Sequence, residues 1–180
     1  MQVRSCGGIS ANPTALLQEI LPDRNVKTKE MSQKKIMGYE KGERQMRTRR
    51  LGKTGLMVSE IGFGGEWLER HPEEESIELI KYASKKGINI LDCWMADPKS
   101  RNIIGEGIKE NRSQWFIQGH IGSTWKDNQY FRTRDMKYVR PAFEDLLKRL
   151  QTDYIDRGMI HYVDSEEEWE KIQHSDYLDY

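Results

Sequence analysis

The chain has 180 residues, of which 36% are hydrophobic and 32% are charged, so it lies on the polar side of globular proteins. Its 29 basic residues balance 29 acidic ones, which excludes a protein held to nucleic acid mainly by phosphate contacts. It has no apolar run near the ~20 residues of a membrane span, no apolar signal-peptide core and only two cysteines, so we expect a cytoplasmic protein without membrane contacts or a disulfide framework.

The balanced charge conceals two unlike parts. Residues 1–50 hold 11 basic and 5 acidic residues, a net charge of +6, which leaves a net charge of −6 for the remainder. We therefore predict a flexible basic leader at residues 1–45 and a folded domain at residues 46–180. The leader could be a binding arm or a targeting peptide, or a solvated extension that precedes a natural start at Met46.

The domain opens with a hairpin and then alternates strands with helices. Residues 49–58 favour two short strands around a glycine-bearing turn, and residues 58–64 favour a further strand. The segments that follow are a helix from Glu73 to Gly87, a strand at 88–92, a helix from about Ser100, a strand at 115–117, a polar loop, a helix from Asp135, a strand at 154–163 and a helix at 166–172.

Strands that are separated by helices need crossover connections, so the sheet should be parallel with helices packed outside it. Four such units in one direction suit either a barrel or a doubly wound sheet. The pattern alone leaves both α/β architectures open.

Three polar residues follow apolar runs at the carboxyl ends of predicted strands, where both architectures place their ligands. They are Asp92, His120 and His161. They could perform acid–base chemistry with a histidine as proton donor, or they could bind a divalent metal ion through two imidazoles and a carboxylate. A third interpretation is that each caps its strand through local hydrogen bonds.

A glycine-rich turn follows the first strand of the alternation. Gly64 and Gly65 would let the backbone approach a ligand, and Trp67 could form a wall of a substrate pocket. The turn lacks the full spacing of a dinucleotide-binding fingerprint.

Several segments resemble the aldo-keto reductase family. RLGKTGLMVSEIGFGG at residues 50–65 resembles the opening of these proteins, GINILD at 87–92 is similar to their second strand, and LQTDYID at 150–156 followed by Ile160 and His161 is similar to their fourth. The resemblance covers about residues 46–180. It implies the first half of a (β/α)8 TIM barrel with an N-terminal β-hairpin, truncated in the fourth helix.

The family's catalytic set of Tyr, Lys, Asp and His is carried over only in part. Asp92 matches the aspartate, and His161 matches the histidine that orients the substrate carbonyl. The tyrosine position falls near Asp97, where there is no tyrosine, and the lysine position falls on His120. His120 could itself donate the proton.

The resemblance implies NADPH-linked reduction of a small carbonyl compound, with Gly64, Gly65 and Asp92 near the cofactor and with Trp67 and His161 near the substrate. Most cofactor contacts in the family come from the second half of the barrel, so we expect this chain alone to be inactive. An iron–sulfur cluster would be expected only in a further C-terminal part. A metal-dependent enzyme and a non-catalytic relative remain alternatives, and the substrate and the oligomeric state stay open.

Overall fold

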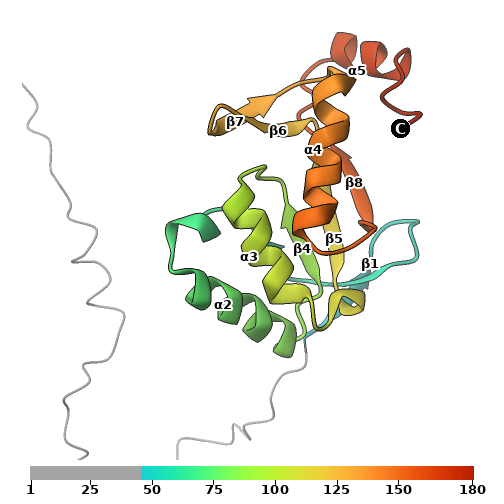
Figure 1. Ribbon diagram of the computed structural model, residues 1–180. Helices are drawn as coiled ribbons and strands as arrows, with labels where there is room; N and C mark the ends of the chain where they lie inside the picture. Colours follow the sequence, from blue (N-terminus) through green and yellow to red (C-terminus); the bar gives the residue numbers. More distant parts are fainter. Residues whose placement is uncertain (1–45) are drawn as a thin grey trace, which may run out of the picture. The chain divides into compact units, whose positions relative to one another are not determined.

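The structure, a computed structural model, describes residues 46–180 (Figure 1), and the predicted leader at 1–45 lies outside the described residues. The described part opens with the predicted hairpin, in which β1 (Thr48–Arg50) pairs antiparallel with β2 (Met57–Ser59). Glu60 forms ion pairs with Arg47 and Arg49, with N–O distances of 2.6 Å each. The hairpin is therefore held at its base.

The prediction of one strand over residues 58–64 was wrong. Its first residues belong to β2, and a separate strand β3 (Phe63–Gly64) follows a turn. The hydroxyl of Ser59 donates to the carbonyl of Ile61 at 2.7 Å, and the amide of Ser59 donates to the Asn89 side chain at 2.7 Å. These local bonds turn the chain out of the hairpin and into the sheet.

The main sheet is parallel and consists of β3, β4 (Ile90–Cys93), β5 (Phe116–Ile121) and β8 (Arg157–Ile160), in that order. Each strand lies beside the next one in the alternation, so the order never reverses as it does in a doubly wound sheet. This order is that of consecutive strands of a barrel. The fourth strand is shorter than the predicted 154–163.

Helices α2 (Glu73–Lys85), α3 (Pro98–Ile108) and α4 (Met136–Arg149) cover one face of this sheet (Figure 1). Among residues 46–180, no helix is both long and apolar enough to cross a bilayer. Short turns of 3₁₀ helix occur at η1 (Leu68–Arg70) and η2 (Arg112–Gln114), and the described chain closes with α5 (Glu166–Gln173).

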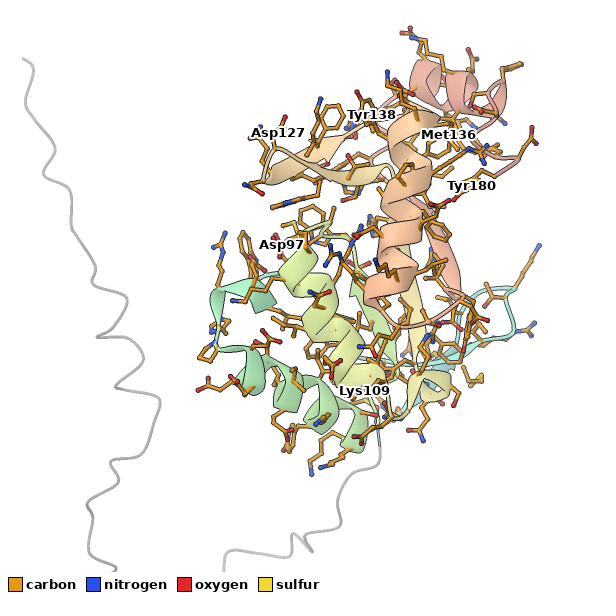
Figure 2. All side chains as sticks on the ribbon, in the orientation of Figure 1. Asp97, Lys109, Asp127, Met136, Tyr138 and Tyr180 are labelled. Atoms are coloured by element: carbon orange, nitrogen blue, oxygen red, sulfur yellow. The ribbon has the colours of Figure 1, made fainter. Side chains whose placement is uncertain are left out.

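The polar loop predicted after the third strand is instead a second hairpin. Strand β6 (Ser123–Lys126) pairs antiparallel with β7 (Gln129–Arg132). Asp127 and Asn128 form its two-residue turn with φ angles of 51° and 60°, as a turn of type I′ requires. Figure 2 shows Asp127 at the tip of this hairpin.

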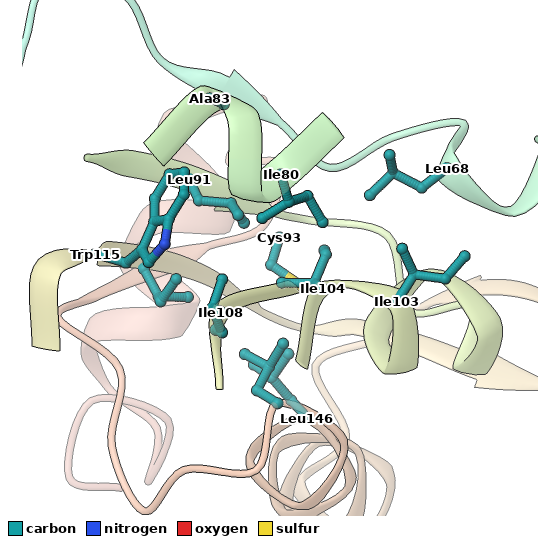
Figure 3. Packing of buried hydrophobic residues seen from close by; sticks show 12 residues of the cluster. Leu68, Ile80, Ala83, Leu91, Cys93, Ile103, Ile104, Ile108, Trp115 and Leu146 are labelled. Carbon is teal, nitrogen blue, oxygen red and sulfur yellow. The ribbon is translucent and has the colours of Figure 1, made fainter. Parts of the chain in front are cut away.

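The apolar core lies between the sheet and the three helices (Figure 3). Alternate strand residues Leu91, Cys93 and Ile117 point to the helices and are at most 2% exposed. Their neighbours in sequence, such as Asp92, Gln118 and His120, must point to the other face of the sheet, because successive side chains of a strand alternate. The strand pattern thus separates the core from the polar residues.

Helices α3 and α4 approach closely at Gly105. A Cβ atom at this position would lie 2.1 Å from the carbonyl oxygen of Arg149, which is a backbone atom that cannot rotate away. The missing side chain lets the end of α4 rest on α3, where Leu150 is 1% exposed.

Replacement of Gly105 by alanine should therefore lower the free energy of unfolding by about 1 to 3 kcal/mol, as overpacking typically does. Gly64→Ala is the matched control, since a Cβ atom there meets nothing within 4 Å. It should change stability by less than about 0.5 kcal/mol. Urea unfolding followed by circular dichroism measures both, and equal midpoints for the two variants would contradict the close approach.

Candidate active site

The structure brings Asp92, His120 and His161 together at the carboxyl edge of the sheet. Nε2 of His120 lies 3.0 Å from Oδ1 of Asp92, and Nδ1 of His120 lies 2.8 Å from Nδ1 of His161. The residues come from three adjacent strands, because Asp92 is in β4, His120 is in β5 and His161 directly follows β8. They form one hydrogen-bonded row rather than three separate strand caps.

Two further residues extend this row at its ends. The Gln118 amide donates to Oδ1 of Asp92, its register partner on the neighbouring strand. At the other end, the hydroxyl of Tyr130 lies 2.7 Å from Nε2 of His161. We call the set Gln118, Asp92, His120, His161 and Tyr130 the polar row.

The backbone and the aromatic rings around His161 fix its orientation. Its amide donates to the carbonyl of Ile121 at 2.9 Å, which continues the pairing of β8 with β5. Its imidazole stacks on the Trp94 indole with an interplanar angle of 8°, and Tyr162 contacts it edge-on. The residue is 4% exposed, so these contacts leave little of the side chain open to solvent.

The β6–β7 hairpin that carries Tyr130 is tied to the edge of the sheet. The hydroxyl of Ser123 donates to the Trp94 carbonyl at 2.6 Å, and Arg132 pairs with Asp164 at 2.7 Å. Arg134 pairs with Glu168 at 2.8 Å. These contacts join the hairpin to the segments that follow β4 and β8.

The hairpin begins at Gly122, whose φ of 96° is a left-handed conformation that favours glycine. A Cβ atom here would also lie 2.6 Å from the Tyr177 hydroxyl and 2.9 Å from the Thr133 carbonyl. Any other residue would therefore displace the base of the hairpin.

The surroundings set the charges of the polar row. Burial opposes ionisation of Asp92, but hydrogen bonds from His120 and Gln118 hold the pKa of its carboxyl below the ordinary value. Burial, with His120, Arg134 and Arg132 nearby, lowers the pKa of His161 to about 4. Burial raises the pKa of Tyr130. At neutral pH the row therefore contains a carboxylate, a neutral His161 and a protonated tyrosine.

The position that aligns near the family tyrosine has a structural role. The Asp97 carboxylate accepts the amide of Ser100 at 2.8 Å, and Pro98 occupies the first turn, so Asp97 is the N-cap of α3 (Figure 2). His120, at the lysine position, is by contrast in the centre of the polar row.

The glycine-rich turn lies next to Asp92. Gly64 is the register partner of Asp92 and is exposed, whereas Gly65 donates its amide to the Asp92 carbonyl at 2.9 Å. A Cβ atom at Gly65 would overlap this carbonyl at 2.8 Å and Ile104 at 2.7 Å, so packing accounts for this glycine. Trp67 is 44% exposed and its ring is covered by the guanidinium of Arg70, 3.3 Å from the ring centroid.

The metal-site interpretation is not supported by this geometry. Both ring nitrogens of His120 are engaged, one by Asp92 and one by His161, so the three side chains bond to one another instead of facing a common point. Within residues 46–180 no group of three or more histidine, cysteine, aspartate or glutamate side chains is arranged to hold a metal ion.

Comparisons with known proteins give a consistent result. The sequence profile of the Aldo/keto reductase family matches residues 60–178. Aldo-keto reductase YhdN of Bacillus subtilis is 37% identical over 120 residues, which are 62% of this chain and 36% of YhdN. The chain therefore spans little more than a third of the length of this relative.

Solved structures share the fold. The holo form of aldo-keto reductase AKR11C1 from Bacillus halodurans is 28% identical and superposes with a TM-score of 0.58 over 71% of this chain and 46% of its own. An aldo-keto reductase from Klebsiella pneumoniae in complex with NADPH gives a TM-score of 0.53 at 20% identity, over 71% of this chain and 45% of its own.

The lowered pKa of His161 predicts a pH dependence of stability. An unfolded histidine takes up a proton near pH 6.5, whereas the folded one resists it until about pH 4, so acid favours the unfolded chain within this window. The free energy of unfolding should fall by at most about 3 kcal/mol from pH 7 to pH 4 through this residue.

Urea unfolding at pH 7 and pH 4.5 checks the effect. His161→Gln should lose less stability than the wild type over this interval, while the exposed control His71→Gln should lose as much as the wild type. Parallel losses in all three proteins would contradict a neutral, buried His161.

Proposed function

Because the chain belongs to the aldo/keto reductase family, an oxidoreductase family, we propose that it forms the reacting end of an enzyme that reduces a small carbonyl compound with NADPH. The observation that carries the proposal is the continuous polar row at the carboxyl edge of a parallel sheet. This edge is where barrels of this class position their catalytic residues. The solved relative from Klebsiella pneumoniae with bound NADPH supports the choice of cofactor.

The residues at this edge fit the nicotinamide end of the cofactor. Gly64 leaves open space where a side chain would stand, directly beside Asp92 in the sheet. A flat ring can approach an exposed backbone of this kind, and the Asp92 carboxylate offers a hydrogen-bond acceptor next to it. We assign Gly64 and Asp92 to the cofactor and keep Trp67 as a proposed wall of the substrate pocket.

When bound, NADPH supplies a hydride to the substrate carbon. The protein must then supply a proton to the carbonyl oxygen, and His120 is the group that we propose as its source. The Asp92 carboxylate, 3.0 Å from Nε2 of His120, would stabilise the protonated imidazole by a charge-assisted hydrogen bond. His161 is hydrogen-bonded to His120 and would connect this proton source to the substrate.

An iron–sulfur cluster is not part of this proposal. Such clusters are held by cysteine thiolates. Cys93, the cysteine within residues 46–180, is buried in the core, and burial raises the pKa of its thiol to about 12.

The reaction is tested by following NADPH oxidation at millimolar cofactor, which compensates for weak binding, with a panel of aldehydes and quinones. Replacement of His120 by glutamine, which keeps a polar side chain but cannot carry a proton, should lower kcat by roughly 10²-fold. The control His174→Gln changes an exposed histidine at the C-terminal end of α5 and should leave kcat unchanged. A protein that oxidises NADPH with no member of the panel would favour a non-catalytic relative instead.

We further propose that the 180-residue chain by itself binds NADPH weakly and is inactive at micromolar cofactor. The chain covers only 36% of YhdN and 45% of the NADPH-bound relative, so much of the surface that holds a dinucleotide in such proteins has no counterpart in it. Calorimetric titration should give a dissociation constant well above micromolar. A micromolar or tighter constant would contradict this, and Gly64→Val, which fills the open space, should weaken whatever binding is measured.

A further inference from the structure

The Tyr130 hydroxyl is the outermost group of the polar row. Neither the family resemblance nor the reaction proposed above gives this tyrosine a role. It lies on the β6–β7 hairpin, 2.7 Å from Nε2 of His161. Its ring is half-buried and contacts Trp94 and His161 edge-on. The tyrosine is therefore held with its hydroxyl at the free end of the hydrogen-bonded row.

The contacts admit one arrangement of protons when both histidines are neutral. The Asp92 carboxylate can only accept, so Nε2 of His120 carries a hydrogen and Nδ1 of His120 is bare. Nδ1 of His161 must then donate to His120, which leaves Nε2 of His161 bare. The Tyr130 hydroxyl consequently donates inward, to His161.

One added proton reverses the row. The proton enters at the hydroxyl of Tyr130, which passes its own hydrogen to Nε2 of His161, while His161 passes the hydrogen on its Nδ1 to Nδ1 of His120. His120 then carries a hydrogen on both ring nitrogens and donates to the bare Nδ1 of His161, and Nε2 of His161 donates to the oxygen of Tyr130. The hydroxyl hydrogen that Tyr130 now carries is not bonded to His161 and is free to bond outward.

We propose that Tyr130 is the catalytic residue that passes the proton to the carbonyl oxygen of the substrate, with His161 and His120 as the relay behind it. This inference rests on the proposed function and deepens it, because it separates the proton reservoir, His120, from the group that touches the substrate. The tyrosine comes from the hairpin and not from the position near Asp97 where the family pattern has one.

The reaction balances along this path. Hydride from the reduced nicotinamide forms the new C–H bond while the C=O double bond becomes a single bond. The O–H bond of Tyr130 breaks as the substrate O–H bond forms, Tyr130 takes the hydrogen from Nε2 of His161, and His161 takes one at Nδ1 from His120. His120 ends neutral, still bonded to Asp92, and is reprotonated from solvent.

The surroundings of Tyr130 suit a fixed donor. Ser123 ties the hairpin to Trp94, and the ion pairs of Arg132 and Arg134 tie it to the segment after β8. Burial raises the pKa of Tyr130, so its hydroxyl holds a proton at neutral pH. The hydrogen bond from Tyr130 to His161 thus joins the β6–β7 hairpin to the segment after β8, and other contacts already hold both in place.

The test uses the 180-residue chain and two variants that each lose one phenolic hydroxyl, Tyr130→Phe and the control Tyr138→Phe. Tyr138 is half-buried on α4 and packs against Phe131 of the same hairpin, but it has no contact with the polar row among the described interactions. Two-bond ¹H–¹⁵N spectra of the imidazoles, recorded with both histidines neutral, report which ring nitrogens carry hydrogen.

In the spectra, the wild type should show His161 with a hydrogen on Nδ1 and a bare, hydrogen-bonded Nε2. Tyr130→Phe should shift the Nε2 resonance toward that of a nitrogen without a hydrogen bond, and Tyr138→Phe should not. An unshifted resonance in Tyr130→Phe, or a hydrogen on Nε2 in the neutral wild type, would overturn the relay.

In assays at millimolar NADPH, which compensate for weak cofactor binding, Tyr130→Phe should lower kcat by about 10²-fold or more, and Tyr138→Phe should stay within about twofold of the wild type. A Tyr130→Phe protein with the activity of the wild type would reject the acid role and leave the proposed function standing. A wild type that reduces no carbonyl rejects the proposed function and the acid role together, and the spectra then decide the relay by themselves.

Discussion

The hydrogen bond between the Asp92 carboxylate and Nε2 of His120 determines which group donates and which accepts in the hydrogen bonds from His120 to Tyr130. A carboxylate accepts and cannot donate, so this one contact determines which nitrogen of each histidine is bare and where the hydroxyl of Tyr130 points. The Gln118 amide reinforces it from the next strand by donating to the same carboxylate oxygen. The parallel register that places these strands side by side is thus the foundation of the site.

Much of this arrangement could be predicted from the sequence. Strand-end residues of a parallel sheet meet at one edge, and this rule alone brought Asp92, His120 and His161 together. The family resemblance favoured a barrel over a doubly wound sheet, and the strand order β3-β4-β5-β8 agrees with consecutive strands of a barrel. Both predictions rest on local sequence patterns, and the topology of the sheet determines where the residues in these patterns lie in space.

What the sequence did not reveal depends on distant contacts. The sequence predicts a polar loop after the third strand, although the Asp127–Asn128 pair between aromatic and polar residues is a hairpin signal. The proximity of Tyr130 to His161 links positions 31 apart and follows from the way in which Ser123, Arg132 and Arg134 anchor the hairpin. Asp97, similarly, shows its capping role only once α3 is seen to begin at Pro98.

The hairpin has an evolutionary consequence. The strands of the parallel sheet are constrained by the helix-facing core and by their neighbours in the sheet, whereas within residues 46–180 β6 and β7 pair only with each other. A chemically useful hydroxyl on such an appendage can be replaced, shifted by a residue or lost while the sheet keeps its register. A lineage can in this way exchange the group that passes the proton to the substrate without rebuilding the sheet that positions Asp92, His120 and His161.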